Sequence, residues 1–336
     1  MDLELLQETL AGLGEPAYRA RQVWSWAARG AGGYAEMSDL PLALREELSE
    51  RVPFSTLTVG DRASSRDGTR KVLLYTGDGR PVETVLMSYR DGRASLCISS
   101  QSGCPLTCTF CATGQMRFFR NLSASEILDQ ALYFRRVAGR ALTNCVFMGM
   151  GEPLMNVDAV LGACERLPEI GVGARHTTVS TVGWIPGIER LAASKLALRL
   201  AFSLHAPEES LRSQLMPVND RYPLADVLAA CRAFYAQRRR RVFIEYVMLA
   251  GVNDSYAQAL QLAALLRTAR ERTSVFKVNL IPYNPAGGPF EGSSRDAIAA
   301  FRGALAARGV PATVRMTRGR DIAAACGQLA APAVAA

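Results

Sequence analysis

Seven short apolar runs separated by helical segments constrain the fold of this chain more than any other feature of its sequence. Runs of this length are typical of strands buried on both faces, and parallel strands need helical crossovers between them. The runs are SLCIS (95–99), NCVFMG (144–149), HTTVST (176–181), LRLAFS (198–203), RVFIEYVM (241–248), VFKVNLI (275–281) and ATVRM (312–316). The alternation predicts an α/β barrel or an open parallel sheet over residues 94–330.

Two smaller regions precede this core. Residues 1–52 carry apolar residues at helical spacing and predict a small helical accessory domain. Residues 53–93 contain the β-like runs KVLLY and VETVLM on either side of a Gly-Asp-Gly turn, which predicts a β-hairpin linker. The Ala-rich residues 331–336 are expected to be a frayed tail.

The charge balance favours a polyanionic partner only modestly. The chain of 336 residues has 39 Lys and Arg against 31 Asp and Glu, a net charge of +8. No apolar run approaches the ~20 residues that span a bilayer, and the acidic start MDLELLQETL differs from a signal peptide. We therefore expect a cytoplasmic protein with no membrane partner.

Three of the eight cysteines form the pattern CxxxCxxC, namely Cys104, Cys108 and Cys111. Closely spaced thiolates on a loop are typical ligands of iron–sulfur clusters, which usually have four. Three ligands would leave one iron open for a small molecule. A zinc site is the alternative, but it usually needs four Cys or His ligands, and the chain has only His176 and His205 with no second CxxC. The pattern therefore favours a [4Fe–4S] cluster.

CxxxCxxC after a strand is similar to the signature of the radical S-adenosylmethionine (SAM) superfamily. This resemblance implies a partial (β/α)6 barrel with the cluster loop after the first strand. It also implies that SAM binds the open iron and is cleaved by one electron to a carbon radical.

A more specific resemblance runs from about residue 82 to residue 329. The chain resembles the RlmN/Cfr family of radical SAM RNA adenine methylases, and YRARQVWSWAARG near the N-terminus resembles that family's accessory domain. The matching segments, in family order, are VETV, SLCISSQSGCPLTCTFCATG, RNLSASEILDQ, FMGMGEPLMN, VSTVG, FSLHAP, IEYVML, VNLIPYNP and TRGRDIAAACGQL.

The family resemblance implies catalytic roles for three residues. Cys326 would carry a methyl group from a first SAM and deliver it to adenine after a second SAM is cleaved. Cys97 would then attack the sulfur of Cys326 and release the RNA as a disulfide forms, and Glu83 would accept the ring proton. Taken alone, each cysteine could be a small buried hydrophobe and Glu83 a solvated strand carboxylate, so these alternatives stay open.

The resemblance also implies a set of SAM contacts, most of which follow the ends of predicted strands, where α/β barrels build their sites. His205 could equally be an ordinary core histidine, and no acid–base role is expected of it. The predicted contacts are Gly151, Glu152, Ser180, Ser203, Leu204, His205 and Asn284.

Within the family, GMGEPL and TRGRDI resemble the C2-methylating type rather than the C8-methylating type. The implied substrate is an adenosine in the peptidyl-transferase region of 23S rRNA, and members of the C2 type also act on an adenosine in the tRNA anticodon loop. The implied partners include an electron donor of the flavodoxin type and a disulfide reductant. The alternatives are a C8 methylase and a non-catalytic iron–sulfur or zinc protein that binds RNA.

Two basic segments are candidates for RNA contact. Arg117, Phe118, Phe119 and Arg120 follow the cluster loop and combine positive charge with aromatic rings, as expected where bases are splayed out and stacked. The arginine run 238–241 is more typical of a solvated helix end.

Overall fold

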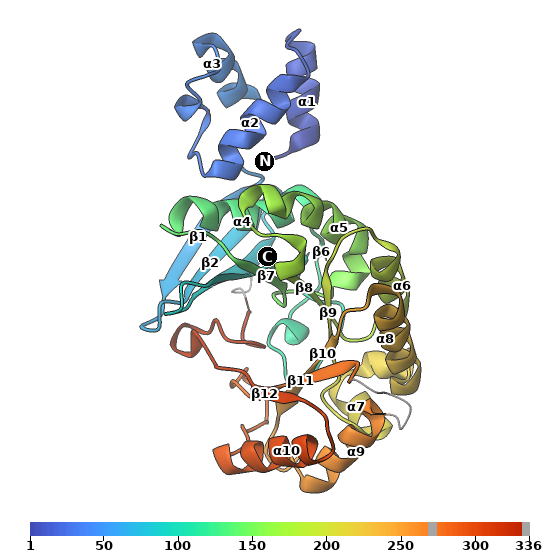
Figure 1. The fold of residues 1–336 in the computed structure, drawn as a ribbon. Helices are drawn as coiled ribbons and strands as arrows, with labels where there is room; N and C mark the ends of the chain where they lie inside the picture. The colour runs from blue at the N-terminus through green and yellow to red at the C-terminus, as the bar shows by residue number, and fades with distance from the viewer. Residues whose placement is uncertain (268–273, 331–336) are drawn as a thin grey trace.

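The computed structural model describes residues 1–267 and 274–330 (Figure 1). The frayed tail expected at 331–336 lies outside the described residues. Three helices form a unit at one end of the molecule: α1 (Leu3–Gly12), α2 (Tyr18–Arg29) and α3 (Leu42–Arg51). Their apolar sides are buried together, with Leu6 and Val23 fully shielded from solvent, as the helical spacing in this region predicts.

A sheet of ten strands forms the centre of the remaining chain, in the order β1-β2-β3-β4-β7-β8-β9-β10-β11-β12. The first four strands are β1 (Leu57–Ser64), β2 (Arg70–Thr76), β3 (Pro81–Ser88) and β4 (Ala94–Cys97). The others are β7 (Asn144–Phe147), β8 (Thr177–Thr181), β9 (Arg199–Ser203), β10 (Val242–Met248), β11 (Phe276–Pro282) and β12 (Ala312–Val314). A separate two-stranded sheet joins β5 (Gln101–Ser102) to β6 (Arg120–Asn121).

Strands β4 and β7 to β12 are parallel to one another and coincide with the seven apolar runs of the sequence, whereas β3 is antiparallel to β4. Helices follow them along the chain and cover the outer face of the curved sheet (Figure 1). They are α4 (Ala124–Val137), α5 (Val157–Arg166), α6 (Ile185–Ala193), α7 (Glu209–Leu215), α8 (Leu224–Arg238), α9 (Tyr256–Leu266) and α10 (Arg295–Ala307). The predicted α/β fold with a partial barrel is confirmed.

Residues 53–93 contain three antiparallel strands where the sequence predicts a two-stranded hairpin. The additional strand, β1, has the sequence LTVGDRAS and buries mainly its first residue, so it lacks the apolar run that would predict it. Strand β3 pairs with β4, and Val85 lies opposite Cys97. The three strands therefore continue the barrel sheet and bring Glu83 on β3 beside the strand that carries Cys97.

The helical unit packs against the barrel through α2, α4 and the segment after α5. The Trp24 indole Nε1 donates a hydrogen bond to Glu169 at 2.5 Å, and the Arg166 guanidinium lies over the same ring. Helix α4 begins with a capping box, because Ser123 and Glu126 bond each other's backbone N–H groups. No helix in the described ranges is long and apolar enough to cross a membrane.

Candidate active site

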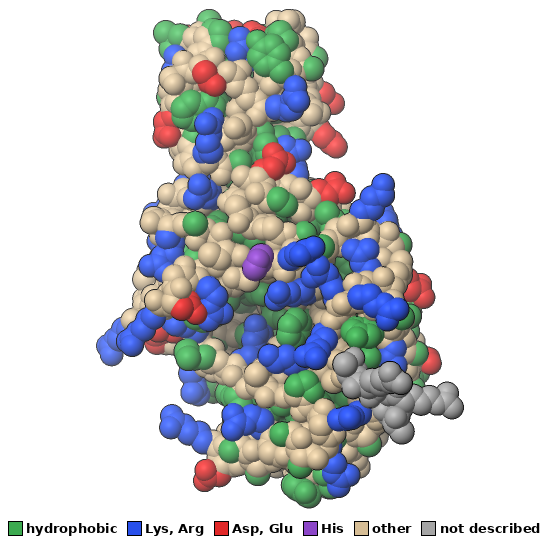
Figure 2. Space-filling model, in the orientation of Figure 1, with side chains coloured by type: hydrophobic (Ala, Val, Ile, Leu, Met, Phe, Trp, Pro, Cys, Tyr) green, Lys and Arg blue, Asp and Glu red, His purple; other side chains and the backbone are tan. Residues whose placement is uncertain are grey.

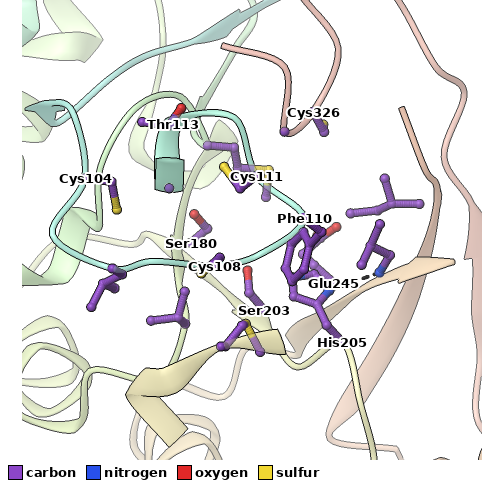
Figure 3. A pocket seen from close by; sticks show the side chains of 18 of the residues that line it. Cys104, Cys108, Phe110, Cys111, Thr113, Ser180, Ser203, His205, Glu245 and Cys326 are labelled. Carbon is purple, nitrogen blue, oxygen red and sulfur yellow. Dashed lines mark hydrogen bonds between the residues drawn. The ribbon is translucent and has the colours of Figure 1, made fainter. Parts of the chain in front are cut away.

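The carboxyl ends of the parallel strands surround a cavity of about 990 Å³, which we call the cluster cavity (Figure 3). Most of the residues expected at the site line it, although they come from distant parts of the chain. They are Cys104, Cys108, Cys111, Gly151, Glu152, Ser180, Ser203, His205, Asn284 and Cys326. In a parallel sheet these strand ends meet at one edge, which is why the segments converge there.

The three cysteines of CxxxCxxC lie along one loop between β5 and β6. Figure 3 shows this loop curving around the cavity, with Cys326 approaching from the C-terminal loop. The turn is tight, because a Cβ at Gly114 would lie 2.7 Å from the Cys108 carbonyl oxygen. The Ala112 N–H donates to the Gly327 carbonyl at 2.8 Å, and the Thr113 hydroxyl donates to the Leu329 carbonyl at 2.6 Å. The cysteine loop and the C-terminal loop are therefore joined.

The donor set fits a [4Fe–4S] cluster. Burial raises the pKa of Cys104 to about 12, and it also raises the pKa values of Cys108 and Cys111. These thiols would stay protonated in the absence of a strongly cationic partner, and iron is such a partner. The three thiols would hold the cluster, and the rest of the cavity leaves room for a further ligand beside it.

Gly151 and Glu152 sit at the turn after β7. Gly151 has φ +94, and a Cβ there would lie 2.5 Å from the Gln101 side chain, so the turn requires glycine. The buried Glu152 carboxylate accepts N–H bonds from Leu154 at 3.0 Å and Val182 at 2.9 Å. Burial nevertheless raises its pKa to about 7. A cationic ligand amine in the cavity would therefore favour the ionised form of Glu152.

His205 and Leu204 differ in their placement. The His205 ring lines the cavity, packs edge to face on Phe110, and accepts the Val247 N–H through Nδ1 at 3.0 Å. Burial and the nearby Arg212 lower its pKa to about 3, so it is neutral and holds the cysteine loop in place. The Leu204 side chain lies in the hydrophobic core and does not line the cavity.

Asn284 provides an observation that favours a bound polar ligand. Its Nδ2 donates to the Cys326 carbonyl at 3.3 Å. Its Oδ1 is buried and has no hydrogen-bond partner within residues 1–267 and 274–330. A buried acceptor without a partner carries a free-energy cost that a ligand N–H or O–H would relieve. Together with Glu152, Ser180 and Ser203, Asn284 fits SAM, which carries an ammonium, a carboxylate and ribose hydroxyls.

Cys97 and Cys326 line a second cavity of about 760 Å³, which we call the thiol cavity. It adjoins the cluster cavity and shares Asn284, Arg315 and Cys326 with it. Cys326 is exposed, whereas burial raises the pKa of Cys97 to about 12 and the proximity of Cys326 adds to that rise. The fold thus brings together two thiols from opposite ends of the barrel sequence.

Glu83 lies beneath the C-terminal loop and does not line either cavity. It is 3% exposed and pairs with the Lys71 ammonium at 2.8 Å, while its second oxygen has no partner within the described ranges. Lys71 also donates to the Ala323 carbonyl at 3.2 Å. The solvated carboxylate considered from the sequence is therefore a buried, paired one.

Sequence reasoning missed Glu245 and Arg315, which both line the cluster cavity. Arg315 pairs with Glu245 at 3.4 Å, and this carboxylate raises the pKa of the guanidinium. Arg315 also opposes the burial effect on the Cys97 pKa. A glutamate inside the apolar run RVFIEYVM was the available signal, because a charged residue in a buried strand needs a partner.

The structure separates the RNA-contact candidates. Arg120 forms ion pairs with Asp78 and Glu126, each at 2.7 Å, so its guanidinium group is already occupied within the protein and is not available to RNA. Phe118 is 37% exposed, and the Arg117 guanidinium lies 5.8 Å from the Phe119 ring centroid. Arg238 donates to the carbonyls of residues 194 and 196, so this member of the arginine run anchors a helix end.

A partial barrel that has a cavity at the carboxyl ends of its strands, with three thiols on one loop beside it, is the arrangement of a radical SAM protein. The family model "Radical SAM superfamily" matches residues 98–263, and "Ribosomal RNA large subunit methyltransferase N-terminal domain" matches residues 1–53. A crystal structure of a radical SAM methyltransferase from Sphaerobacter thermophilus superposes with a TM-score of 0.90 at 47% identity, covering 98% of this chain and 97% of that one.

Curated relatives specify the family further. A probable dual-specificity RNA methyltransferase RlmN from Chloroflexus aurantiacus is 49% identical, covering 98% of this chain and 91% of the relative. The dual-specificity RNA methyltransferase RlmN from Anaeromyxobacter dehalogenans is 47% identical, covering 98% and 90%. The chain belongs to the RlmN family of radical SAM methyltransferases and is an enzyme.

Proposed function

We propose that this enzyme methylates C2 of an adenosine in the peptidyl-transferase region of 23S rRNA, and of an adenosine in the tRNA anticodon loop, through a methyl group carried on Cys326. The observation that carries the proposal is the meeting of Cys97, Cys326 and the three-cysteine loop around two adjoining cavities. The printed names of the relatives support RNA as the substrate.

The residues of the cluster cavity would divide the binding work. Cys104, Cys108 and Cys111 would hold the cluster, and Glu152 would accept hydrogen bonds from the SAM ammonium. Gly151, Ser180, Ser203, His205 and Asn284 would shape and hydrogen-bond the rest of SAM, while Leu204 would act from the core by supporting its neighbours. When bound, the cluster and SAM supply the radical that activates a methyl group.

The thiol cavity would perform the transfer. Cys326 is exposed and on a loop, so it can accept a methyl group as a thioether and present it to an adenine. Glu83 lies outside both cavities beneath the C-terminal loop, so it would take the ring proton after this loop moves, and its oxygen without a partner supports this role. Cys97 would then attack the Cys326 sulfur, forming a disulfide as the methylated RNA leaves.

Further parts of the proposal concern organisation and partners. Residues 1–52 would form an RNA-binding accessory domain, residues 53–93 a linker that carries Glu83, and residues 94–330 the catalytic barrel. A flavodoxin-type electron donor would supply the electron and a disulfide reductant would reset the cysteine pair. These reductants and the RNA substrates would place the enzyme in the cytoplasm.

The decisive experiment incubates the anaerobically reconstituted enzyme with SAM, reductant and unmodified 23S rRNA or tRNA. We expect 2-methyladenosine from the wild type and none from Cys326→Ala. Cys97→Ala should trap RNA covalently on Cys326, seen as a shifted protein band that ribonuclease digests. Cys145→Ala, a buried cysteine outside both cavities, is the matched control. Formation of 8-methyladenosine would contradict the C2 assignment.

A further inference from the structure

A third depression continues outward from the thiol cavity. Its lining includes Tyr89, Met316, Thr317 and Arg318, all of which also line the thiol cavity. We call it the arginine cleft, because its rim carries five arginines: Arg66, Arg90, Arg93, Arg140 and Arg318.

Four separate segments contribute these arginines. Arg66 lies on the β1–β2 turn, Arg90 and Arg93 on the β3–β4 turn, Arg140 after α4, and Arg318 after β12. In Figure 1 the tip of the β1–β2 hairpin reaches the C-terminal loop, and Figure 2 shows Lys and Arg side chains along this edge. The Arg318 guanidinium fixes the contact by donating to the Asp67 carbonyl at 2.6 Å.

The two aspartates in the cleft, Asp67 and Asp91, already have partners within the protein and do not neutralise its remaining arginines. Asp91 pairs with Arg93 at 2.8 Å, and Asp67 accepts the Gly319 N–H at 2.9 Å. Arg66, Arg90 and Arg140 are exposed, and their guanidinium groups have no partner among the described side chains. Three charges therefore remain available for an anionic ligand.

Tyr89 marks the boundary between the arginine cleft and the thiol cavity. Its half-buried ring is covered by two guanidinium groups, whose central carbons lie 4.4 Å (Arg93) and 4.6 Å (Arg318) from the ring centroid. The ring therefore fixes these two arginines, whose planes can stack on a base, while the other arginines of the cleft bind phosphates. An acidic protein could also pair with the arginines. It would not need the path that leads from the cleft past Tyr89 to the two thiols, whereas an RNA base that reacts at those thiols would.

Resting on the proposed function, we infer that the arginine cleft binds the phosphate backbone of the RNA next to the target adenosine, and that the target base turns past Tyr89 into the thiol cavity. The cleft then sets the affinity and register of the substrate strand, and the thiol cavity performs the chemistry.

The test uses the reconstituted full-length enzyme and an unmodified 23S rRNA fragment. The triple variant R66A/R90A/R140A should bind this RNA at least tenfold more weakly at low salt. The slope of log Kd against log salt concentration should fall by about 2, since each phosphate contact on a single strand contributes about 0.7. The triple variant R295A/R302A/R308A removes three exposed arginines on or after α10 and should match the wild type.

Kinetics distinguish binding from chemistry. The cleft variant should raise KM for RNA while kcat at saturating RNA stays within about twofold of wild type. Each single variant should lower the slope by about 0.7, which guards against a folding defect in the triple variant. Tyr89→Ala should raise KM about tenfold, and Tyr89→Phe should not, because the ring is retained.

Two outcomes would overturn the inference. The first is a cleft variant that binds RNA with the affinity and salt slope of the α10 control. The second is a cleft variant that keeps RNA affinity but is reduced more slowly by its electron donor, which would assign the cleft to an acidic protein. If the wild type forms no methyladenosine, the proposed function fails, yet the salt slopes still report on the cleft.

Discussion

At the scale of single residues, ion pairs and buried rings hold the catalytic loops in register. Glu83 and Lys71 pair on neighbouring strands, and Lys71 continues to the Ala323 carbonyl of the C-terminal loop. One ammonium group thus joins the proposed proton acceptor to the loop that carries Cys326. On the other side of the site, neutral His205 packs on Phe110 of the cysteine loop.

Lys71→Met should lower the free energy of unfolding by about 3 kcal/mol, because it leaves the Glu83 carboxylate buried without its cation. The double variant Lys71→Met/Glu83→Gln should recover most of this loss, since no unpaired charge remains. Urea titrations of the wild type, the two single variants Lys71→Met and Glu83→Gln, and the double variant complete the cycle. Additive effects of the two changes would contradict the coupling between Lys71 and Glu83.

The pH dependence of stability should reflect His205. Because its pKa falls from 6.5 to about 3 on folding, the unfolded chain binds a proton that the folded chain refuses. His205 should therefore lower the free energy of unfolding by ~1.4 kcal/mol per pH unit as the pH falls from about 6 toward 3, and it should have no effect at higher pH. Glu152 acts in the opposite direction as the pH falls below about 7, because folding raises its pKa from 4.5 to about 7, so the His205 effect is measured as the difference between the wild type and a His205 variant.

Urea titrations of the apoprotein at pH 7 and pH 5 measure this effect. His205→Asn removes the titrating group, so the variant should gain stability relative to the wild type between pH 7 and pH 5. Asn also tolerates the left-handed backbone at φ 60. His176→Asn, at the exposed second histidine, is the control. An equal change in stability between pH 7 and pH 5 in His205→Asn and wild type would refute the assignment.

At the scale of elements, the site forms where several loops meet at the carboxyl edge of the parallel sheet, and no single described helix or strand contains it. The cysteine loop and the C-terminal loop are joined by the Thr113 hydroxyl at the Leu329 carbonyl and the Ala112 N–H at the Gly327 carbonyl. In the proposed reaction Cys326 must occupy two positions, one to take the methyl group and one to deliver it. These bonds would set how readily its loop leaves the present position.

Thr113→Val should loosen the C-terminal loop about fivefold, because one hydrogen bond of about 1 kcal/mol is lost without a change of shape. Hydrogen exchange of residues 320–330 should accelerate by that factor. Thr109→Val, on the same loop but bonded to the Leu215 carbonyl, should leave the exchange unchanged. Equal exchange in the Thr113 variant and wild type would show that the hydroxyl does not restrain the loop.

At the scale of the whole molecule, the helical unit and the barrel share one continuous hydrophobic core. Trp24 is 2% exposed and connects the helical unit to Glu169 and Arg166 of the barrel. Within the described part of the chain, no residue of the helical unit lines the cluster cavity or the thiol cavity. A substitution that removes the Trp24 contact should therefore lower the stability of the protein and its affinity for RNA more than the rate of SAM cleavage.

Trp24→Ala should lower the free energy of unfolding by about 3–5 kcal/mol, the usual range for truncating a buried large aromatic side chain. SAM cleavage without RNA should proceed at the wild-type rate, while RNA binding weakens if residues 1–52 contact RNA as proposed. Trp26→Ala, in the same helix and only half-buried, should cost less. Loss of SAM cleavage in Trp24→Ala would show that the helical unit supports the barrel site directly.

Local patterns in the sequence predicted a large part of this structure. All seven parallel strands follow from continuous apolar runs. Strand β1 was missed because its sequence is polar and Gly-containing. Glu245 and Arg315 were missed because only their mutual pairing shows why charged groups lie at a buried edge.

By itself, the sequence determined the α/β class, the cysteine loop and the family of the enzyme, because periodicity and motif spacing are carried by neighbouring residues. Only the tertiary structure decided that Cys97 and Cys326 share a cavity, that Glu83 is buried against Lys71, and that arginines from four segments form one cleft. These features depend on strand register and on loops converging at one edge of the sheet, and no local pattern encodes that convergence.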